Sequence, residues 1–142
     1  VDMAGEKGIL SLSKKVTQGQ IINYAEVSRD FNPVHWDEGF AKKSQFGRPI
    51  AHGMLVLAFV SEMMTRAYGK SWLDSGKLKV RFKEPVFPGN LVEIFGRESH
   101  RSILNGYTVV QCTVGCKNSD GREVISGTAE VRILNFDIGD KE

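Results

Sequence analysis

Hydrophobic and polar residues change their spacing along the chain, and these changes divide it into elements. Residues 8–16 alternate weakly between apolar and polar, which predicts a short strand. From Thr17 the apolar positions recur at helical spacing, and Gln20 completes a capping box with Thr17. We therefore expect a first helix of about three turns that ends near Arg29.

Two loops and a short helix follow. Proline disfavours the helical region for the residue before it, so residues 30–35 (DFNPVH) are expected to form an irregular, mostly extended turn. Asp37 can cap a second, short helix that runs to Lys43. Residues 46–51 contain a glycine and a proline, and they predict another loop.

The next segment is apolar on nearly every side of a helix. Over residues 53–64 only Ser61 and Glu62 interrupt it, and Gly69 stands where a C-terminal cap would be. Such a helix must be covered by other structure. We therefore expect the rest of the chain to wrap around it.

The residues after this helix predict strands. Residues 77–83 alternate basic with apolar side chains, which is typical of a strand with one buried face and one solvated face. Asn105-Gly106 and Asp120-Gly121 are strong hairpin signals, and Gly127 predicts a bulge. The hairpins would join three strands into a meander, at residues 91–98, 107–117 and 123–136. The predicted fold class is α+β, with a curved, five-stranded antiparallel sheet wrapped around a long central helix.

Composition and charge narrow the functional classes. With 142 residues, 41% apolar and 25% charged, the chain fits one globular domain, residues 1–142. A net charge of +2 is too small to favour a nucleic-acid partner. The longest apolar run is far short of the roughly 20 residues that span a bilayer, and no signal segment opens the chain. We therefore expect a cytoplasmic protein without membrane insertion. Cys112 and Cys116 are interpreted as two small core residues on one strand face.

Asp30 and His35 are the first candidates for chemistry. A turn held by Asn32 and Pro33 could bring their carboxylate and imidazole to one water. Such a pair can move protons between water and carbon, each transfer contributing about 10²–10⁴-fold in rate. An aspartate near Asn-Pro also commonly closes a turn, and a single histidine is commonly structural. Spacing alone leaves both interpretations open.

Gly53 opens the apolar helix directly after His52. The first N–H groups of a helix lack intrahelical partners and lie at the positive end of its dipole, so they could polarise a carbonyl oxygen. A glycine needed for close packing is the alternative. His52 could join His35 and Asp37 as metal ligands, but no metal-binding spacing supports this, and we expect no metal.

A long segment around these residues resembles a known family. Residues 24–61 read YAEVSRDFNPVHWDEGFAKKSQFGRPIAHGMLVLAFVS, and they closely resemble the signature of the MaoC-like (R)-specific enoyl-CoA hydratases, or hydratase 2, which have the hot-dog fold. PVFPGN at residues 85–90 is similar to the turn before that family's third strand. Many relatives have a glycine where this chain has Arg29, and the difference could alter access to the site.

The resemblance implies a role for each matching residue. Asp30 and His35 would be the catalytic pair, and the N–H of Gly53 would bind the thioester carbonyl. Ser61 would support the aspartate, and Asn32 would organise the loop.

The resemblance also implies a reaction. A water held between the catalytic pair would add to the β-carbon of a trans-2-enoyl thioester and give an (R)-3-hydroxyacyl thioester; the reverse reaction is a dehydration. Such a lyase of fatty-acid metabolism needs no metal or redox cofactor, and coenzyme A or acyl-carrier protein carries its substrate. Phe59, Met63 and Met64 are candidates to line an acyl tunnel, with core packing as the alternative.

A single hot-dog unit leaves one end of its sheet open, and the family closes it by pairing two protomers. We therefore expect a homodimer, or a higher assembly of dimers, with the site near the subunit interface.

Other functions remain open on this fold. A 3-hydroxyacyl-carrier-protein dehydratase of fatty-acid synthesis would use the same residues. A non-catalytic acyl-CoA-binding protein is the second alternative, although a pure binder has no need of an acid–base pair. A hot-dog thioesterase would need a carboxylate on the central helix, where only Glu62 stands.

Overall fold

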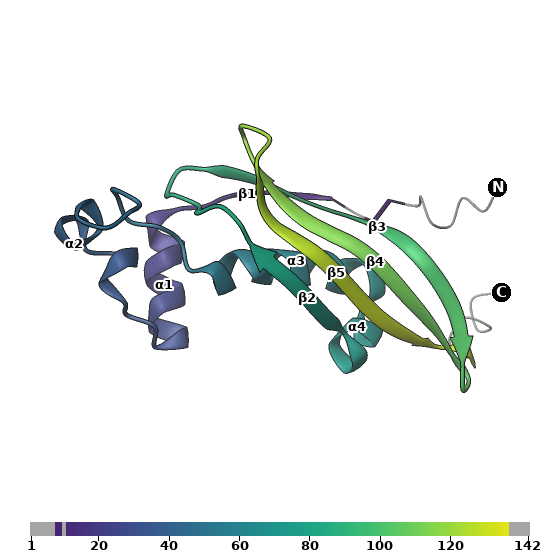
Figure 1. Cartoon of the computed structure of the whole chain (residues 1–142). Coiled ribbons are helices and arrows are strands. Elements are labelled where there is room, and N and C mark those ends of the chain that lie inside the picture. Colours follow the sequence, from purple (N-terminus) through teal and green to yellow (C-terminus); the bar gives the residue numbers. More distant parts are fainter. Residues whose placement is uncertain (1–7, 10, 137–142) are drawn as a thin grey trace.

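A single curved sheet and a set of helices make up the computed structural model, which describes residues 8–9 and 11–136 (Figure 1). In chain order the elements are β1 (Leu12–Lys15), α1 (Gln18–Ser28), the 3₁₀ helix η2 (Pro33–His35), α2 (Glu38–Lys42), α3 (Gly53–Tyr68), α4 (Lys70–Ser75), β2 (Lys77–Phe82), β3 (Leu91–Leu104), β4 (Tyr107–Asn118) and β5 (Glu123–Leu134). The five strands are antiparallel in the order β1-β3-β4-β5-β2. The predicted class and sheet are confirmed.

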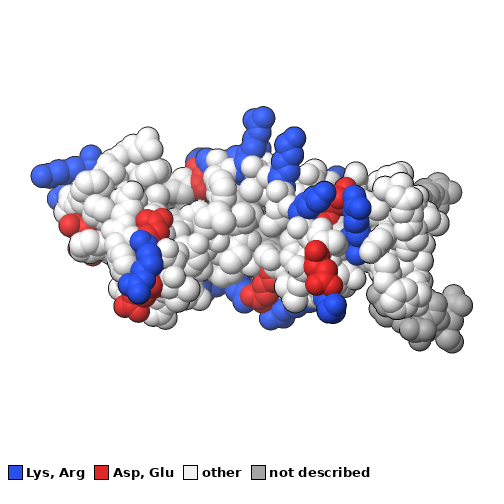
Figure 2. Space-filling model, turned by 90° about the horizontal axis from the view of Figure 1, so that it is seen from below, with Lys and Arg blue, Asp and Glu red and all other residues white. Residues whose placement is uncertain are grey.

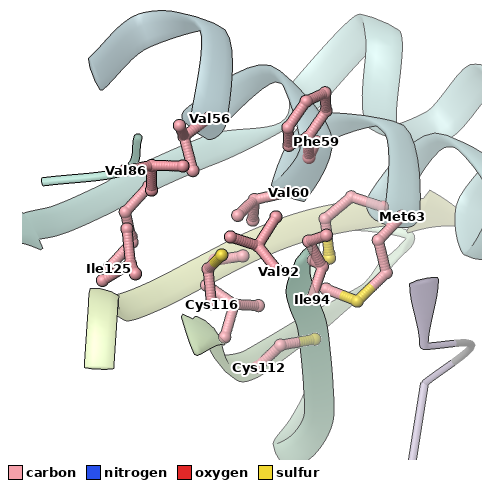
Figure 3. Packing of buried hydrophobic residues seen from close by; sticks show 14 of the residues in the cluster. Val56, Phe59, Val60, Met63, Val86, Val92, Ile94, Cys112, Cys116 and Ile125 are labelled. Carbon is pink, nitrogen blue, oxygen red and sulfur yellow. The ribbon is translucent and has the colours of Figure 1, made fainter. Parts of the chain in front are cut away.

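Helix α3 packs one face against the sheet. Its buried side chains recur at helical spacing, and none is more than 8% exposed: Val56, Phe59, Val60, Met63 and Met64. Figure 3 shows this face meeting side chains of the sheet, among them Val92, Ile94, Cys112, Cys116 and Ile125. Burial of each such side chain contributes about 1.5–3 kcal/mol, so this contact determines where α3 lies.

The other face of α3 is open, contrary to prediction. The sequence indicated a helix covered on all sides, but Met54 is 57% exposed and Leu57 is only partly buried. The reason is that the described sheet reaches only one side of the helix. The apolar residues on the other side of α3 are therefore not needed for packing within the protomer.

Strand β2 lies at an edge of the sheet because it pairs with β5 rather than with β3, the next strand in the chain. Its predicted buried face is therefore only half-covered: Leu78 and Val80 are partly buried, and Phe82 is 53% exposed. Strand β1 forms the opposite edge and is shorter than the predicted 8–16; residue 10 of that prediction lies outside the described residues.

The predicted hairpins are confirmed. Asn105 and Gly106 both have positive φ, 50° and 83°, and they join β3 directly to β4, so β3 extends well beyond the predicted residue 98. The second hairpin turns through Gly121, whose φ is 78°. Together β3, β4 and β5 form the expected meander.

The bulge predicted at Gly127 is wrong. Gly127 pairs in regular register with Val114 on β4 and with Val80 on β2. A Cβ at this position would lie 2.1 Å from the carbonyl oxygen of Lys79, so glycine is needed for close approach of β2.

Local predictions along the helices have mixed outcomes. The capping box is confirmed, since Thr17 and Gln20 exchange two hydrogen bonds of 3.1 Å. Asp37 caps α2 as predicted, and residues 46–51 form a loop. Helix α4, which buries Trp72, was not predicted. Cys112 and Cys116 are free and buried, as expected of core residues.

Candidate functional site

The DFNPVH segment is more compact than predicted. Asp30 Oδ1 accepts a hydrogen bond from the N–H of Asn32 (3.2 Å), and Asn32 Oδ1 accepts one from the N–H of Val34 (3.1 Å). These two side chains close successive turns, and Asn32 caps η2, in which Pro33 is the first residue. The extended turn was a wrong prediction because the restriction imposed by proline applies to Asn32 and not to the residues after it.

Arg29 has a backbone conformation that favours glycine. It ends α1 in the left-handed region, with φ 64° and ψ 19°. This conformation costs roughly 1–2 kcal/mol for a residue with a Cβ and little for glycine. The effect of Arg29 on access to the site stays a prediction.

His35 is buried and its ring is oriented by the backbone. Nδ1 lies 2.8 Å from the carbonyl oxygen of Ile50, which can only accept, so Nδ1 carries the proton and Nε2 of the neutral ring keeps a lone pair. Burial lowers the pKa of His35 from its ordinary value of 6.5, and the adjacent His52 lowers it further, while the Ile50 carbonyl and Asp30 oppose the shift. The ring is thus favoured as a neutral proton acceptor.

His52 belongs to the same cluster. Its ring stacks on that of His35, with centroids 3.7 Å apart and planes at 25°, and its Nε2 lies 3.0 Å from the carbonyl oxygen of Asp30. Sequence reasoning considered His52 only as a metal ligand beside Asp37. Asp37 lies outside the cluster and caps α2 through the N–H of Phe40. The signal for His52 was its position directly before Gly53.

Asp30, His35 and His52 offer ligand atoms that all lie within 4.8 Å of one another, so they are the residues that could hold a metal. Each imidazole donates one N–H to a backbone carbonyl and keeps its other nitrogen available as a ligand. The lone pairs of imidazoles lie in the ring planes, however, and two stacked rings do not direct them at one ion. The arrangement suits a hydrogen-bonded water better.

Gly53 is the first residue of α3. The carbonyl oxygen of His52 accepts from Leu55 (3.1 Å) and Val56 (3.3 Å), whereas the N–H groups of Gly53 and Met54 have no hydrogen-bond partner within the described ranges. A Cβ on Gly53 would lie 3.1 Å from the ring of Phe82. The helix therefore presents free donors at its positive end, directly beside the histidine stack.

The loop before Gly53 is tied to both motifs. The N–H of Ile50 donates to the carbonyl of Val34 in the DFNPVH segment (3.2 Å), and the N–H of Ala51 donates to the carbonyl of Val86 in PVFPGN (2.7 Å). Two stretches that are far apart in sequence thus hold one loop between them.

Two mainly apolar hollows flank the cluster. One, of about 230 Å³, is lined by His35 together with Ile21, Ile22, Ala25, Glu26, Phe31 and Trp36. The other, of about 240 Å³, is lined by Gly53 together with Phe46, Ile50, Ala51, Val56, Phe82, Lys83, Glu84, Pro85, Val86 and Val124. One hollow therefore opens onto the histidine and the other onto the start of α3.

The remaining predicted residues lie along α3. The hydroxyl of Ser61 accepts from Trp72 Nε1 at 3.0 Å, which is its described side-chain contact, so support of Asp30 by Ser61 stays a prediction. Phe59, Met63 and Met64 pack in the core and line neither hollow. Their role in an acyl tunnel also stays a prediction.

Comparison with known proteins identifies the family. The model of the MaoC like domain matches residues 2–129. The chain belongs to the MaoC-like family. It is 30% identical to the (R)-specific enoyl-CoA hydratase of Aeromonas caviae over 86% of this chain and 90% of that protein. It is 32% identical to a mitochondrial 3-hydroxyacyl-[acyl-carrier-protein] dehydratase of Arabidopsis thaliana over 92% of this chain and 78% of that protein.

Solved structures agree with this MaoC-like assignment. The (R)-hydratase of A. caviae involved in PHA biosynthesis superimposes with a TM-score of 0.75 at 27% identity, covering 88% of this chain and 92% of that one. The hot-dog fold expected from the sequence is thereby confirmed. Within the part of the chain that the structure describes, no helix is both long and apolar enough to cross a membrane.

The surroundings of His35 predict a pH-dependent stability. Because its folded pKa is lowered from 6.5, the unfolded chain binds a proton there more readily, and the free energy of unfolding should fall as the pH is lowered from about 6.5. We expect NMR titration of the His35 ring to give a pKa below 6.5. Denaturant unfolding of His35→Gln, which cannot titrate, should lack this part of the pH dependence. A pKa of 6.5 or above in the folded protein would contradict the lowered pKa of the buried ring.

Proposed function

We propose that this MaoC-like protein is an (R)-specific enoyl-CoA hydratase, a lyase of fatty-acid metabolism. The observation that carries the proposal is the meeting of Asp30 and His35 beside the free N–H of Gly53. The similarity to the A. caviae enzyme over most of both chains supports it.

The geometry suggests which group would act in each step of the reaction. A water would be held between the Asp30 carboxylate and His35 Nε2, the lone-pair nitrogen. Its oxygen would bond to the β-carbon of a trans-2-enoyl thioester while the pair takes up one of its protons. The electrons of the double bond move toward the thioester oxygen, where the Gly53 N–H stabilises the negative charge. The α-carbon then receives a proton from the pair on the same face, so that one water is added in total.

The proposed reaction needs no redox cofactor. Addition of water leaves the substrate neither oxidised nor reduced overall, and the acid, base and oxyanion donor are all supplied by the chain. Coenzyme A would serve only as the carrier of the acyl group. We also propose a cytoplasmic location; recovery of the native protein in a secreted or organellar fraction would contradict it.

A carrier-protein dehydratase is the second candidate. The A. thaliana relative bears that name, and its match covers 92% of this chain. Asp30, His35 and Gly53 would then catalyse the reverse reaction, a dehydration. A silent acyl-CoA binder is less well supported, because a buried histidine with a free Nε2 has no evident purpose in a protein that only binds.

We further propose a homodimer, or an assembly of dimers, formed through the start of α3 and the edge of β2. Met54 and Phe82 are both more than half exposed there, and the ring of Phe82 lies against Gly53. Strand β2 also has an unpaired edge. Figure 2 shows a face on which charged side chains of both signs are separated by uncharged surface. If a second copy of the chain covered Met54 and Phe82, the site would lie near the interface.

Hydration of crotonyl-CoA tests the function. Loss of the conjugated enoyl-thioester absorbance, with an (R)-3-hydroxy product by chiral analysis, is expected for the native protein. Asp30→Asn and His35→Gln should each lower kcat by about 10²–10⁴-fold, because each removes one proton-transfer group. His100→Gln, at an exposed histidine on β3, is the matched control and should keep full activity. Near-normal rates in either site variant would remove that residue from the mechanism; turnover only of carrier-protein substrates would favour the second candidate.

A pair of substitutions isolates the N–H of Gly53. Proline is tolerated at the first position of a helix and removes only that donor, whereas alanine adds a similar Cβ near Phe82 but keeps the N–H. Gly53→Pro should therefore have a kcat about 10²–10³-fold below that of Gly53→Ala, as expected for loss of one oxyanion donor. Equal rates in the two variants would show that this N–H does not stabilise the transition state.

Light scattering in solution tests the assembly. The native protein should have twice the mass of one chain, or a multiple of that. Met54→Glu should shift it toward the monomer, because a charge would be buried in the interface. Ile103→Glu, at an even more exposed apolar residue near the end of β3, should leave the mass unchanged. A monodisperse, active monomer of the native chain would refute the dimer.

A further inference from the structure

We propose that His52 is a positioning residue. Its side chain keeps Asp30 and His35 in a fixed position relative to the backbone N–H of Gly53. The inference rests on the proposed function, since it concerns the same site. It assigns a task to the one buried imidazole that the proposed reaction does not use.

The first contact is a hydrogen bond across 22 residues of sequence. Nε2 of His52 lies 3.0 Å from the carbonyl oxygen of Asp30, and because a carbonyl only accepts, Nε2 is the donor. The other described hydrogen bonds of Asp30 are local, to Ser28 and Asn32. Among the described residues, His52 is therefore the partner that ties Asp30 itself to a distant part of the chain.

The second contact is the ring stack. His35 has a single described side-chain hydrogen bond, from Nδ1 to Ile50, and one such bond leaves the ring plane free to rotate about it. The ring of His52, 3.7 Å away and tilted by 25°, restricts that rotation. The ring of Tyr24 packs against that of His52, with centroids 4.8 Å apart, and helps to hold it in place. The stack thus directs the free Nε2 of His35.

The third contact is through the backbone. The carbonyl of His52 accepts the first hydrogen bonds of α3, from Leu55 and Val56, and the next peptide unit supplies the N–H of Gly53. One residue consequently touches the carboxylate loop, the imidazole and the oxyanion donor. A displacement of about 1 Å among such groups can cost about 100-fold in rate.

The buried Nδ1 of His52 argues against a purely structural purpose. With Nε2 as donor, Nδ1 is an acceptor, yet it has no partner in the described structure although His52 is only 2% exposed. A buried polar atom without a partner is unfavourable, and an apolar side chain would fill the same space without it. The donor nitrogen therefore accounts for the presence of histidine.

Two amide substitutions separate the donor from the ring. The amide nitrogen of glutamine reaches about as far as Nε2, and that of asparagine only as far as Nδ1. His52→Gln can therefore keep the bond to Asp30, whereas His52→Asn cannot. On crotonyl-CoA we expect kcat to fall about 100-fold in His52→Asn and to recover by at least tenfold in His52→Gln, with KM changed little in both. His100→Gln and His100→Asn are the controls.

Several results would overturn the inference. Near-native kcat in His52→Asn, or an equal loss of kcat in both variants with unchanged melting temperature, would show that the donor does not position the pair. NMR of the native protein gives an answer that does not depend on folding of a variant: the proton of His52 should be on Nε2, and a proton on Nδ1 instead would refute the bond. Absence of turnover by the native protein would count against the proposed function, while the NMR result would still test the geometry.

Discussion

The packing of one face of α3 against the curved sheet is the constraint on which the site depends. It buries five large side chains and so determines where the helix begins. His52 and Gly53 stand at that beginning, so their positions follow from a hydrophobic contact that contains no catalytic group. A core built along one face of the helix thus orients the donors at its start, which a flexible loop could not do.

The loop that carries Asp30 and His35 is organised by different forces. Short polar side chains close its turns, and backbone carbonyls orient its histidine. The loop contributes little to the core, yet hydrogen bonds from Ile50 and Ala51 connect it to the turn before β3. Polar contacts of modest individual strength therefore bring the acid–base pair to the helix start, and burial of the imidazole lowers its pKa as a consequence.

The open face of α3 and the edge of β2 both leave surface in water that would be more stable if covered. An apolar helix and an unpaired strand are both unfavourable in water, and here they lie side by side, since Phe82 of β2 contacts the first residue of α3. Covering them would also enclose the hollow lined by Gly53. Exclusion of water from that hollow would strengthen the interaction between the helix donors and a bound carbonyl.

The sequence by itself determined the elements whose signals are local. The capping box at Thr17, the turn at Asn105-Gly106 and the apolar helix after Gly53 all depend on neighbours within a few residues, and the structure has each of them. Asp30, His35 and Gly53 were also found from sequence, through a motif and a family resemblance. Only the tertiary structure decided where β1 and β2 pair in the sheet. The pairing of β2 with β5 leaves Phe82 exposed and requires a glycine at 127, because strand order depends on contacts between distant segments. For the same reason the contacts of His52 could not be found from its position before Gly53: its partners, Asp30 and His35, are 22 and 17 residues away, and only the fold brings the two imidazole rings and the Asp30 carbonyl into contact.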